Sequence, residues 1–155
     1  MKGSGLAGVG VTPRGLLWLL GLFMVPAVLT SCGGQHAVES GDYTIYVQGS
    51  SLLPRGGEDA QIEGMLALHE GCVVLESEES HVWYPVVWPA RTSIASADPF
   101  AIKLPSGVEL ALGERVTGGG GYHQPENVEA DIPQECLGET NEIAVFNPDA
   151  DPSKG

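Results

Sequence analysis

The three cysteines are the residues of this chain whose chemistry is most clearly limited by their positions. Cys32 follows an apolar run and two small polar residues, whereas Cys72 and Cys136 lie in the body of the sequence. A cysteine thiolate is a nucleophile, so each thiol can accept a covalent group, form a disulfide or bind a metal. The surrounding sequence indicates which of these reactions applies to each cysteine.

An apolar run at residues 16–30 follows a short segment that contains Lys2 and Arg14 and no acid. This layout is typical of a secretory signal peptide. A helix of about fifteen residues spans only roughly 22 Å, short of the roughly 30 Å hydrocarbon core of a bilayer, and Pro26 weakens such a helix further. We therefore predict a signal peptide at residues 1–31, with a retained transmembrane anchor as the alternative.

The end of this run, Leu29-Thr30-Ser31-Cys32, resembles the lipobox of bacterial lipoproteins at all four positions. The resemblance implies that the Cys32 thiol receives a diacylglyceryl group and that a dedicated peptidase cuts between Ser31 and Cys32. Acyl chains such as palmitate would then anchor the mature protein at the extracytoplasmic face of the cell membrane. Two acyl chains bind a membrane stably, whereas a single chain binds it only marginally. The alternative is an ordinary signal peptide cleaved nearby, with Cys32 an incidental thiol.

Lipidation of Cys32 would leave Cys72 and Cys136 as an even pair in an oxidising compartment, where we expect them to form a disulfide. Closing a loop of about 65 residues would contribute roughly 4 kcal/mol in the chain-entropy model. A metal or redox pair is the alternative, but it needs closer spacing or neighbouring ligands.

The acidic excess limits the range of partners. All twenty acids lie in residues 32–155, against five basic residues there (Arg55, Arg91, Lys103, Arg115 and Lys154), which gives this segment a net charge of −15. Phosphates and anionic headgroups repel such a polyanion. We therefore predict no nucleic-acid partner, and a folded body that stands off the membrane to which its lipid attaches.

The histidines and the acidic loop carry no recognised metal-binding spacing. His69 and His81 are candidates for a two-histidine metal site if the fold brings them together, although each by itself is expected to be a surface residue. Glu76, Glu78 and Glu79 lack the spacing of a calcium loop, so a solvated loop is favoured. We predict no metal site and no cofactor.

Hydrolytic chemistry also lacks a motif. Ser106 lies in a Pro-Ser-Gly segment typical of a turn, and no G-x-S-x-G sequence is present. Glu109 with Asp98 or Glu114 remains a candidate carboxylate pair for an envelope hydrolase. We predict no catalytic residue, with a hydrolase or metal-dependent enzyme as the alternative.

Aromatic residues and glycines are the remaining candidates for ligand contact. Trp83, Trp88 and Tyr122 are candidates for stacking on sugar rings of a cell-wall glycan, against the stronger expectation of core packing. The four glycines Gly118–Gly121 lack the Lys-Ser/Thr pair and the following helix of a phosphate loop, so a flexible connection or tight bend is favoured.

The folded part of the chain has an all-β pattern. Short apolar runs alternate with turn signals, and no window shows a helical period. Hairpins are predicted at Glu70–Gly71 and around Pro105–Gly107. About six strands in roughly 90 residues must close into a small OB-like barrel, closed or partly open, or stack as a β-sandwich. The predicted strands are 43–47 (an edge-strand candidate), 62–68, 72–75, 82–88, 100–104, 108–112, 115–117 and 143–146.

Two further resemblances are short. Leu112–Gly119 is similar to a turn-bearing strand of many OB-type barrels. The Gly71-Cys72 step and the segment Tyr84–Pro89 look like small uncharacterised lipoproteins of high-GC Gram-positive bacteria, which imply no activity.

These expectations combine into one domain plan: a signal peptide at 1–31, a lipidated N-terminus and flexible tether at 32–58, a β domain at 59–147 and a disordered tail at 148–155. The function predicted is a lipid-anchored binding or interaction module of the cell envelope, with an envelope protein or cell-wall glycan as its partner. A passive structural lipoprotein is the further alternative.

Overall fold

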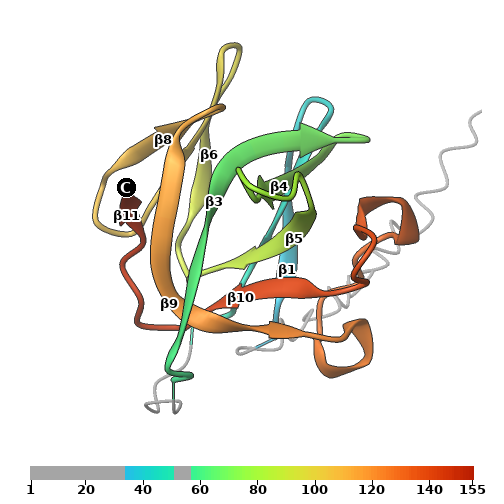
Figure 1. Cartoon of the computed structure of the whole chain (residues 1–155). Helices are drawn as coiled ribbons and strands as arrows, with labels where there is room; N and C mark the ends of the chain where they lie inside the picture. The colour runs from blue at the N-terminus through green and yellow to red at the C-terminus, as the bar shows by residue number, and fades with distance from the viewer. Residues whose placement is uncertain (1–33, 51–56) are drawn as a thin grey trace, which may run out of the picture.

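The computed structural model describes residues 34–50 and 57–155, which form an all-β domain (Figure 1). The predicted signal peptide and the lipobox residues up to Cys32 lie outside the described residues. Two short 3-10 helices, η1 (Pro125–Asn127) and η2 (Gln134–Cys136), lie between the last long strands. The strands are β1 (His36–Ser40), β2 (Tyr43–Val47), β3 (Ala60–His69), β4 (Cys72–Glu76), β5 (Trp83–Trp88), β6 (Ser93–Ala97), β7 (Phe100–Lys103), β8 (Glu109–Ala111), β9 (Arg115–His123), β10 (Ile143–Phe146) and β11 (Ser153–Lys154).

Six strands of the larger sheet pair in a ring, in the order β2, β4, β3, β9, β10, β5 and back to β2. β1 extends this sheet beside β2, and β11 pairs with β9. β3 is antiparallel to both β4 and β9, whereas β2 is parallel to both β4 and β5. The all-β prediction is confirmed. The ring has the strand pairing expected of a small barrel, and a closely stacked sandwich is also consistent with it.

The core lies inside the ring because alternate residues of each strand point inward. Ile62 and Leu66 of β3 are buried, and Trp88 of β5 stacks on Phe146 of β10 with ring centroids 5.3 Å apart. The small sheet β6–β7–β8 adds Ile102 and other apolar residues to the same core. Both predicted hairpins form: β3–β4, with Glu70 and Gly71 at its tip, and β7–β8.

The glycines Gly118–Gly121 lie inside β9, not in the flexible connection or tight bend that was predicted. A Cβ at Gly120 would collide with the Val145 carbonyl and the Ile62 side chain, and one at Gly121 would collide with the Glu58 carboxylate. Glycine inside a strand marks this kind of close approach. In Figure 1, β9 curves along β3 and continues to β10.

The N-terminal segment also differs from the prediction, because His36–Ser40, expected in a flexible tether, forms β1. This strand pairs with β2 from His36↔Val47 to Ser40↔Tyr43, and Val38 packs against the core. The predicted 43–47 strand is present as β2. β2 does not lie at an edge, because it is covered by β1 on one side and by β4 and β5 on the other.

The C-terminal segment, predicted as a disordered tail, returns to the sheet. Ser153 and Lys154 pair with Thr117 and Val116 of β9, and Lys154 Nζ lies 2.7 Å from Glu114 Oε1. β9 has an unpaired side at this point, since β10 covers only its C-terminal half. The polar composition gave no indication of this late pairing.

Residues 124–142 cover the outer face of β2 and β5. Val128, Ala130 and Ile132 pack against the buried Tyr46 and Val87 there. Cys136 of η2 lies at disulfide distance from Cys72 at the start of β4, with Cα atoms 5.7 Å apart. The predicted Cys72–Cys136 pair is therefore confirmed, and it fastens the covering segment to the sheet.

Candidate binding site

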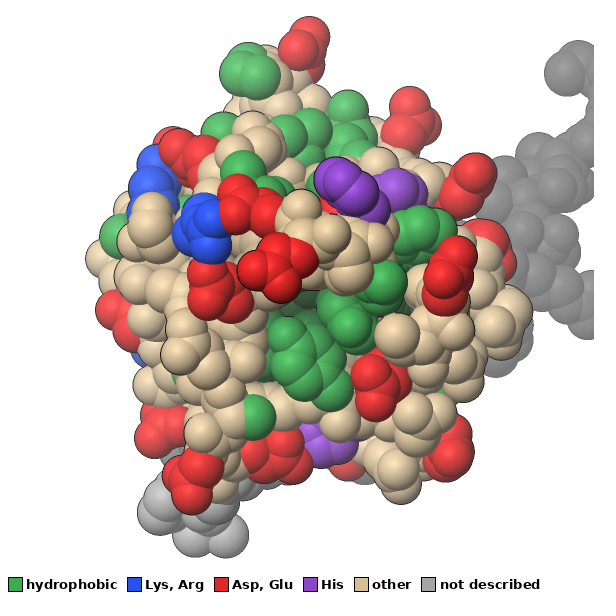
Figure 2. Space-filling model, viewed as in Figure 1, with side chains coloured by type: hydrophobic (Ala, Val, Ile, Leu, Met, Phe, Trp, Pro, Cys, Tyr) green, Lys and Arg blue, Asp and Glu red, His purple; other side chains and the backbone are tan. Residues whose placement is uncertain are grey.

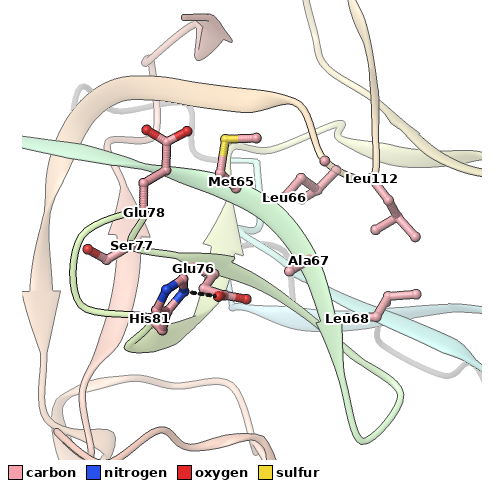
Figure 3. A pocket seen from close by; sticks show the side chains of 10 residues that line it. Met65, Leu66, Ala67, Leu68, Glu76, Ser77, Glu78, His81 and Leu112 are labelled. Atoms are coloured by element: carbon pink, nitrogen blue, oxygen red, sulfur yellow. Dashed lines mark hydrogen bonds and ion pairs between the residues drawn. The ribbon is translucent and has the colours of Figure 1, made fainter.

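A pocket of about 500 Å³ lies over the outer side of β3 (Figure 3). The β3 strand contributes Met65–Leu68, and the turn before β9 contributes Leu112 and Gly113. On the other side lie Glu76 at the end of β4 and Ser77, Glu78 and His81 of the β4–β5 loop. We call this the β3 pocket; its volume falls in the range of small-molecule and side-chain sites.

The β4–β5 loop is held in a tight conformation that places its side chains at the pocket. The Ser77 N–H donates to the Val82 carbonyl at 2.8 Å, and the His81 N–H donates to the Ser77 carbonyl at 2.9 Å. His81 adopts a left-handed backbone with φ of 56°. Non-glycine residues seldom adopt this conformation, although histidine does so more often than most.

Glu76 joins two histidines at one side of the pocket. Its carboxylate lies 3.0 Å from His81 Nδ1 and 3.5 Å from His69 Nε2. Hydrogen bonds lower the pKa of the Glu76 carboxyl, the larger effect coming from His81 and the smaller from His69. Figure 3 shows the His81–Glu76 contact on one side of β3 and Leu112 on the other. The pocket thus has an apolar flank and a polar, charged flank.

A second hollow of about 380 Å³ adjoins the β3 pocket and shares Ser77 and Glu78 with it. Its remaining lining includes Glu63, Glu79 and Arg115. The Arg115 guanidinium is ion-paired with both Glu63 and Glu78. Three carboxylates therefore surround one cation, and we call this region the acidic hollow.

The same face carries hydrophobic side chains in a hollow near its middle, with acidic side chains around it (Figure 2). Histidine side chains lie above the hollow, and basic side chains are few on this face and close to acids. Tyr122 and Leu112 are among the exposed large hydrophobic residues, at 38% and 40% exposure. Apolar surface bordered by charge is typical of an interaction site.

The three aromatic candidates are separated by the fold. Trp88 is completely buried in the core, so its ring offers no face to a surface glycan. Trp83 is half-buried and stacks on His69. The exposed Tyr122 packs beside Tyr84, with the two ring centroids 4.8 Å apart. Burial, together with Tyr84 and nearby acids, raises the pKa of the Tyr122 hydroxyl. These residues do not form one aromatic platform.

The metal and carboxylate candidates are also placed by the structure. His69 and His81 both contact Glu76, but no three His, Cys, Asp or Glu residues in the described part of the chain are arranged so that they could hold a metal ion. Glu114 accepts from the Ala111 N–H at 2.7 Å and pairs with Lys154, so its carboxylate serves the β8–β9 turn. Ser106 lies in the β7–β8 turn.

Sequence reasoning missed the residues that build the pocket itself. Met65 and Ala67 lay within the predicted strand 62–68 and Leu112 at the end of the predicted strand 108–112, and none of them was a site candidate. Arg115 lay in the OB-like segment 112–119 and was not a site candidate. The one available signal was the alternation in β3, which leaves Met65 as a large apolar residue on the polar face.

The domain is a small β domain with an apolar and acidic cleft on one face. No protein-family model, no curated protein and no solved structure matches the chain. Within residues 34–50 and 57–155 there is no helix long and apolar enough to cross a bilayer.

Proposed function

We propose that this protein is a lipid-anchored binding module of the bacterial cell envelope, which presents the β3 pocket to a partner outside the cytoplasm. The observation that carries the proposal is the pocket: exposed Leu112 and the outward Met65 adjoin the polar side chains Glu76, Glu78 and His81. Apolar surface beside convergent polar groups is the usual composition of a binding site.

The start of β1 supports an outward presentation of the pocket. A lipid on Cys32 would be only four residues from His36, a reach of at most about 14 Å. Gln35 is fixed to the covering segment, since its Oε1 accepts from the Ala130 N–H at 2.9 Å. In Figure 1 the β1–β2 turn and the pocket-bearing half of β3 lie at the top, whereas β1 begins at the lower end. The anchor would leave from the end away from the pocket.

Between the two partners considered, an envelope protein is favoured over a wall glycan. Trp88 is buried and Trp83 is covered on one face by His69, so the surface lacks the open aromatic faces on which sugar rings stack. The β3 pocket instead offers aliphatic side chains and carboxylates. These match amino-acid side chains of a protein partner.

A photo-crosslinking amino acid placed at residue 112 in the full-length protein, in the cells that make it, tests the binding function. The matched control is position 108, because Val108 is another exposed apolar residue (38%) of the same region but does not line the pocket. We expect a specific adduct from position 112 and none from position 108. Equal adducts, or none from position 112, would overturn the proposed site.

The anchoring is tested separately with Cys32→Ala. We expect this variant to lose fatty-acid labelling and to be released from membranes, while Cys72 and Cys136 remain paired. Labelling that persists in Cys32→Ala would overturn the lipid anchor without bearing on the pocket.

A further inference from the structure

We infer that the β3 pocket and the acidic hollow together bind an extended peptide segment in which an apolar side chain lies close to a basic one. This inference rests on the proposed binding function and names the chemistry of its partner. The two cavities adjoin each other, since Ser77 and Glu78 line both of them. An extended segment that lies across this face would contact both.

The first element of recognition is the apolar flank. Met65, Leu66, Ala67, Leu68 and Leu112 line about 500 Å³ of open space, with Leu112 at 40% exposure. An apolar side chain buried here would remove both its own surface and that of Leu112 from water, which is favourable. This region therefore selects an apolar group.

The second element is charge. In the acidic hollow, Glu63, Glu78 and Glu79 outnumber Arg115, and Glu76 stands at the adjoining edge. Arg115 pairs with Glu63 and Glu78, while Glu79 has no ion-pair partner among the residues that the structure describes. A Lys or Arg side chain of the ligand fits this excess of carboxylates. A second copy of this chain would not fit, because its own acidic residues would be repelled by these carboxylates.

The third element is a free strand edge, which favours a peptide over other ligands. The pairing of β3 with β9 ends at Met65↔Arg115, and two more backbone bonds join Leu66 to Glu114 and Gly113. His69↔Cys72 closes the β3–β4 hairpin, and the residues of β3 alternate between bonding to β4 and facing the other way. The N–H and C=O of Leu68 therefore point away from β4, to the same side as those of Leu66. No strand among the described residues pairs with Leu68 on that side.

These elements act together because they lie along the same strand. Leu68 provides a donor and an acceptor for a peptide main chain, as in strand addition to a sheet edge. The apolar flank begins at the same residue, and the acidic hollow follows toward Glu63. From Leu66 toward Glu63 this edge is occupied by the turn before β9 and by β9 itself, so the main-chain contact is confined to Leu68, and a ligand would reach the acidic hollow across the outer face of β3.

The test uses the lipidated protein in nanodiscs of neutral phosphatidylcholine, which hold no anionic lipid to attract basic peptides. The probe is a fluorescent peptide, capped at both ends, with Leu two residues from Lys in a Ser background, measured by anisotropy. Three control peptides replace Lys by Glu, replace Leu by Ser, or carry an N-methyl group on the Leu nitrogen. We expect saturable binding of the first peptide and at least about fivefold weaker binding of each control.

Matched protein variants assign the binding to this face. Glu79→Gln and Leu112→Ser are expected to weaken binding by about fivefold, whereas Glu126→Gln and Val108→Ser, exposed residues outside both cavities, leave it unchanged. Unfolding midpoints show that each variant is folded. Equal binding of the Lys and Glu peptides, or equal loss in the control variants, overturns the inference.

The outcome separates this inference from the proposed function. A specific adduct from position 112, with no preference for the Leu-Lys peptide, would retain the binding module and overturn its peptide partner. An adduct with glycan or lipid would likewise retain the binding module and overturn the peptide partner. Loss of both the adduct and the peptide binding would overturn both proposals.

Discussion

The imidazole of His69 stacks on the indole of Trp83, with ring centroids 4.3 Å apart and planes inclined by 4°. Nε2 of the same imidazole lies 3.5 Å from Glu76, whose other carboxylate oxygen lies 3.0 Å from His81. The aromatic face and the carboxylate together fix His69 beside the β3 pocket. Glu76 thereby connects the two histidines and orders one flank of the site.

The pH dependence of stability should reflect Glu76. Because its pKa is lowered in the folded protein, its contribution is present above the ordinary carboxyl value of 4.5 and is lost as the pH falls through the folded pKa. We predict that Glu76→Gln is less stable than the natural protein near pH 6 and that the difference disappears toward pH 3. Urea unfolding across this range measures it, with Glu79→Gln as the control from the same loop. A difference that stays constant with pH would contradict the explanation.

The disulfide should account for much of the stability of so small a domain. Cys72 and Cys136 are 64 residues apart, so the chain-entropy model gives a loss of about 4 kcal/mol for the paired Cys→Ser variant. We predict a large fall in the urea midpoint for this variant. The same fall should follow reduction of the natural protein, whereas the Ser variant should not respond to reductant. A reductant-sensitive midpoint in the Ser variant would show that another effect is involved.

The elements found from sequence were those whose patterns reflect their local environment. The hairpin at Glu70–Gly71 was predictable because Gly71 adopts positive φ without strain, as it does at 81°; Glu70 also has a positive φ, of 50°, which its residue type does not favour. β1 was missed because the polar segment His36–Ser40 is held by pairing with β2. β6 (Ser93–Ala97) was missed for a similar reason, since its small and polar residues pair with β7. In both cases the partner is the next strand in the sequence, so the strand is defined by its hairpin partner and not by its own composition.

The site was predictable only in its parts. The approach of His69 and His81 was considered from sequence, but their common partner Glu76 depends on the β4–β5 loop conformation. The pocket forms where β3 outruns its pairing with β9, and the sequence of neither strand indicates where that pairing ends. Charge composition gave the acidic excess but not its position beside Leu112.

The two tryptophans of β5 should differ in their energetic roles. Trp88 is fully buried against Phe146, whereas Trp83 is half-buried beneath His69. We predict that Trp88→Ala costs about 3–5 kcal/mol and that Trp83→Ala costs less, because its cavity opens toward solvent. Chemical unfolding of each variant measures the difference. Equal costs would argue against the placement of Trp88 in the core.

The glycines of β9 should be required by packing and to different degrees. At Gly120 an added Cβ meets the backbone carbonyl of Val145 and the backbone of Phe146, which have no room to move. At Gly119 the nearest atom is the Asn147 side-chain amide at 3.2 Å, a flexible group. We therefore predict that Gly120→Ala destabilises the fold by about 1–3 kcal/mol, as overpacking does, and that Gly119→Ala has a smaller effect. Thermal and urea unfolding of the two variants test this order. If Gly119→Ala proves the more damaging substitution, close approach of β10 does not explain why glycine is needed at position 120.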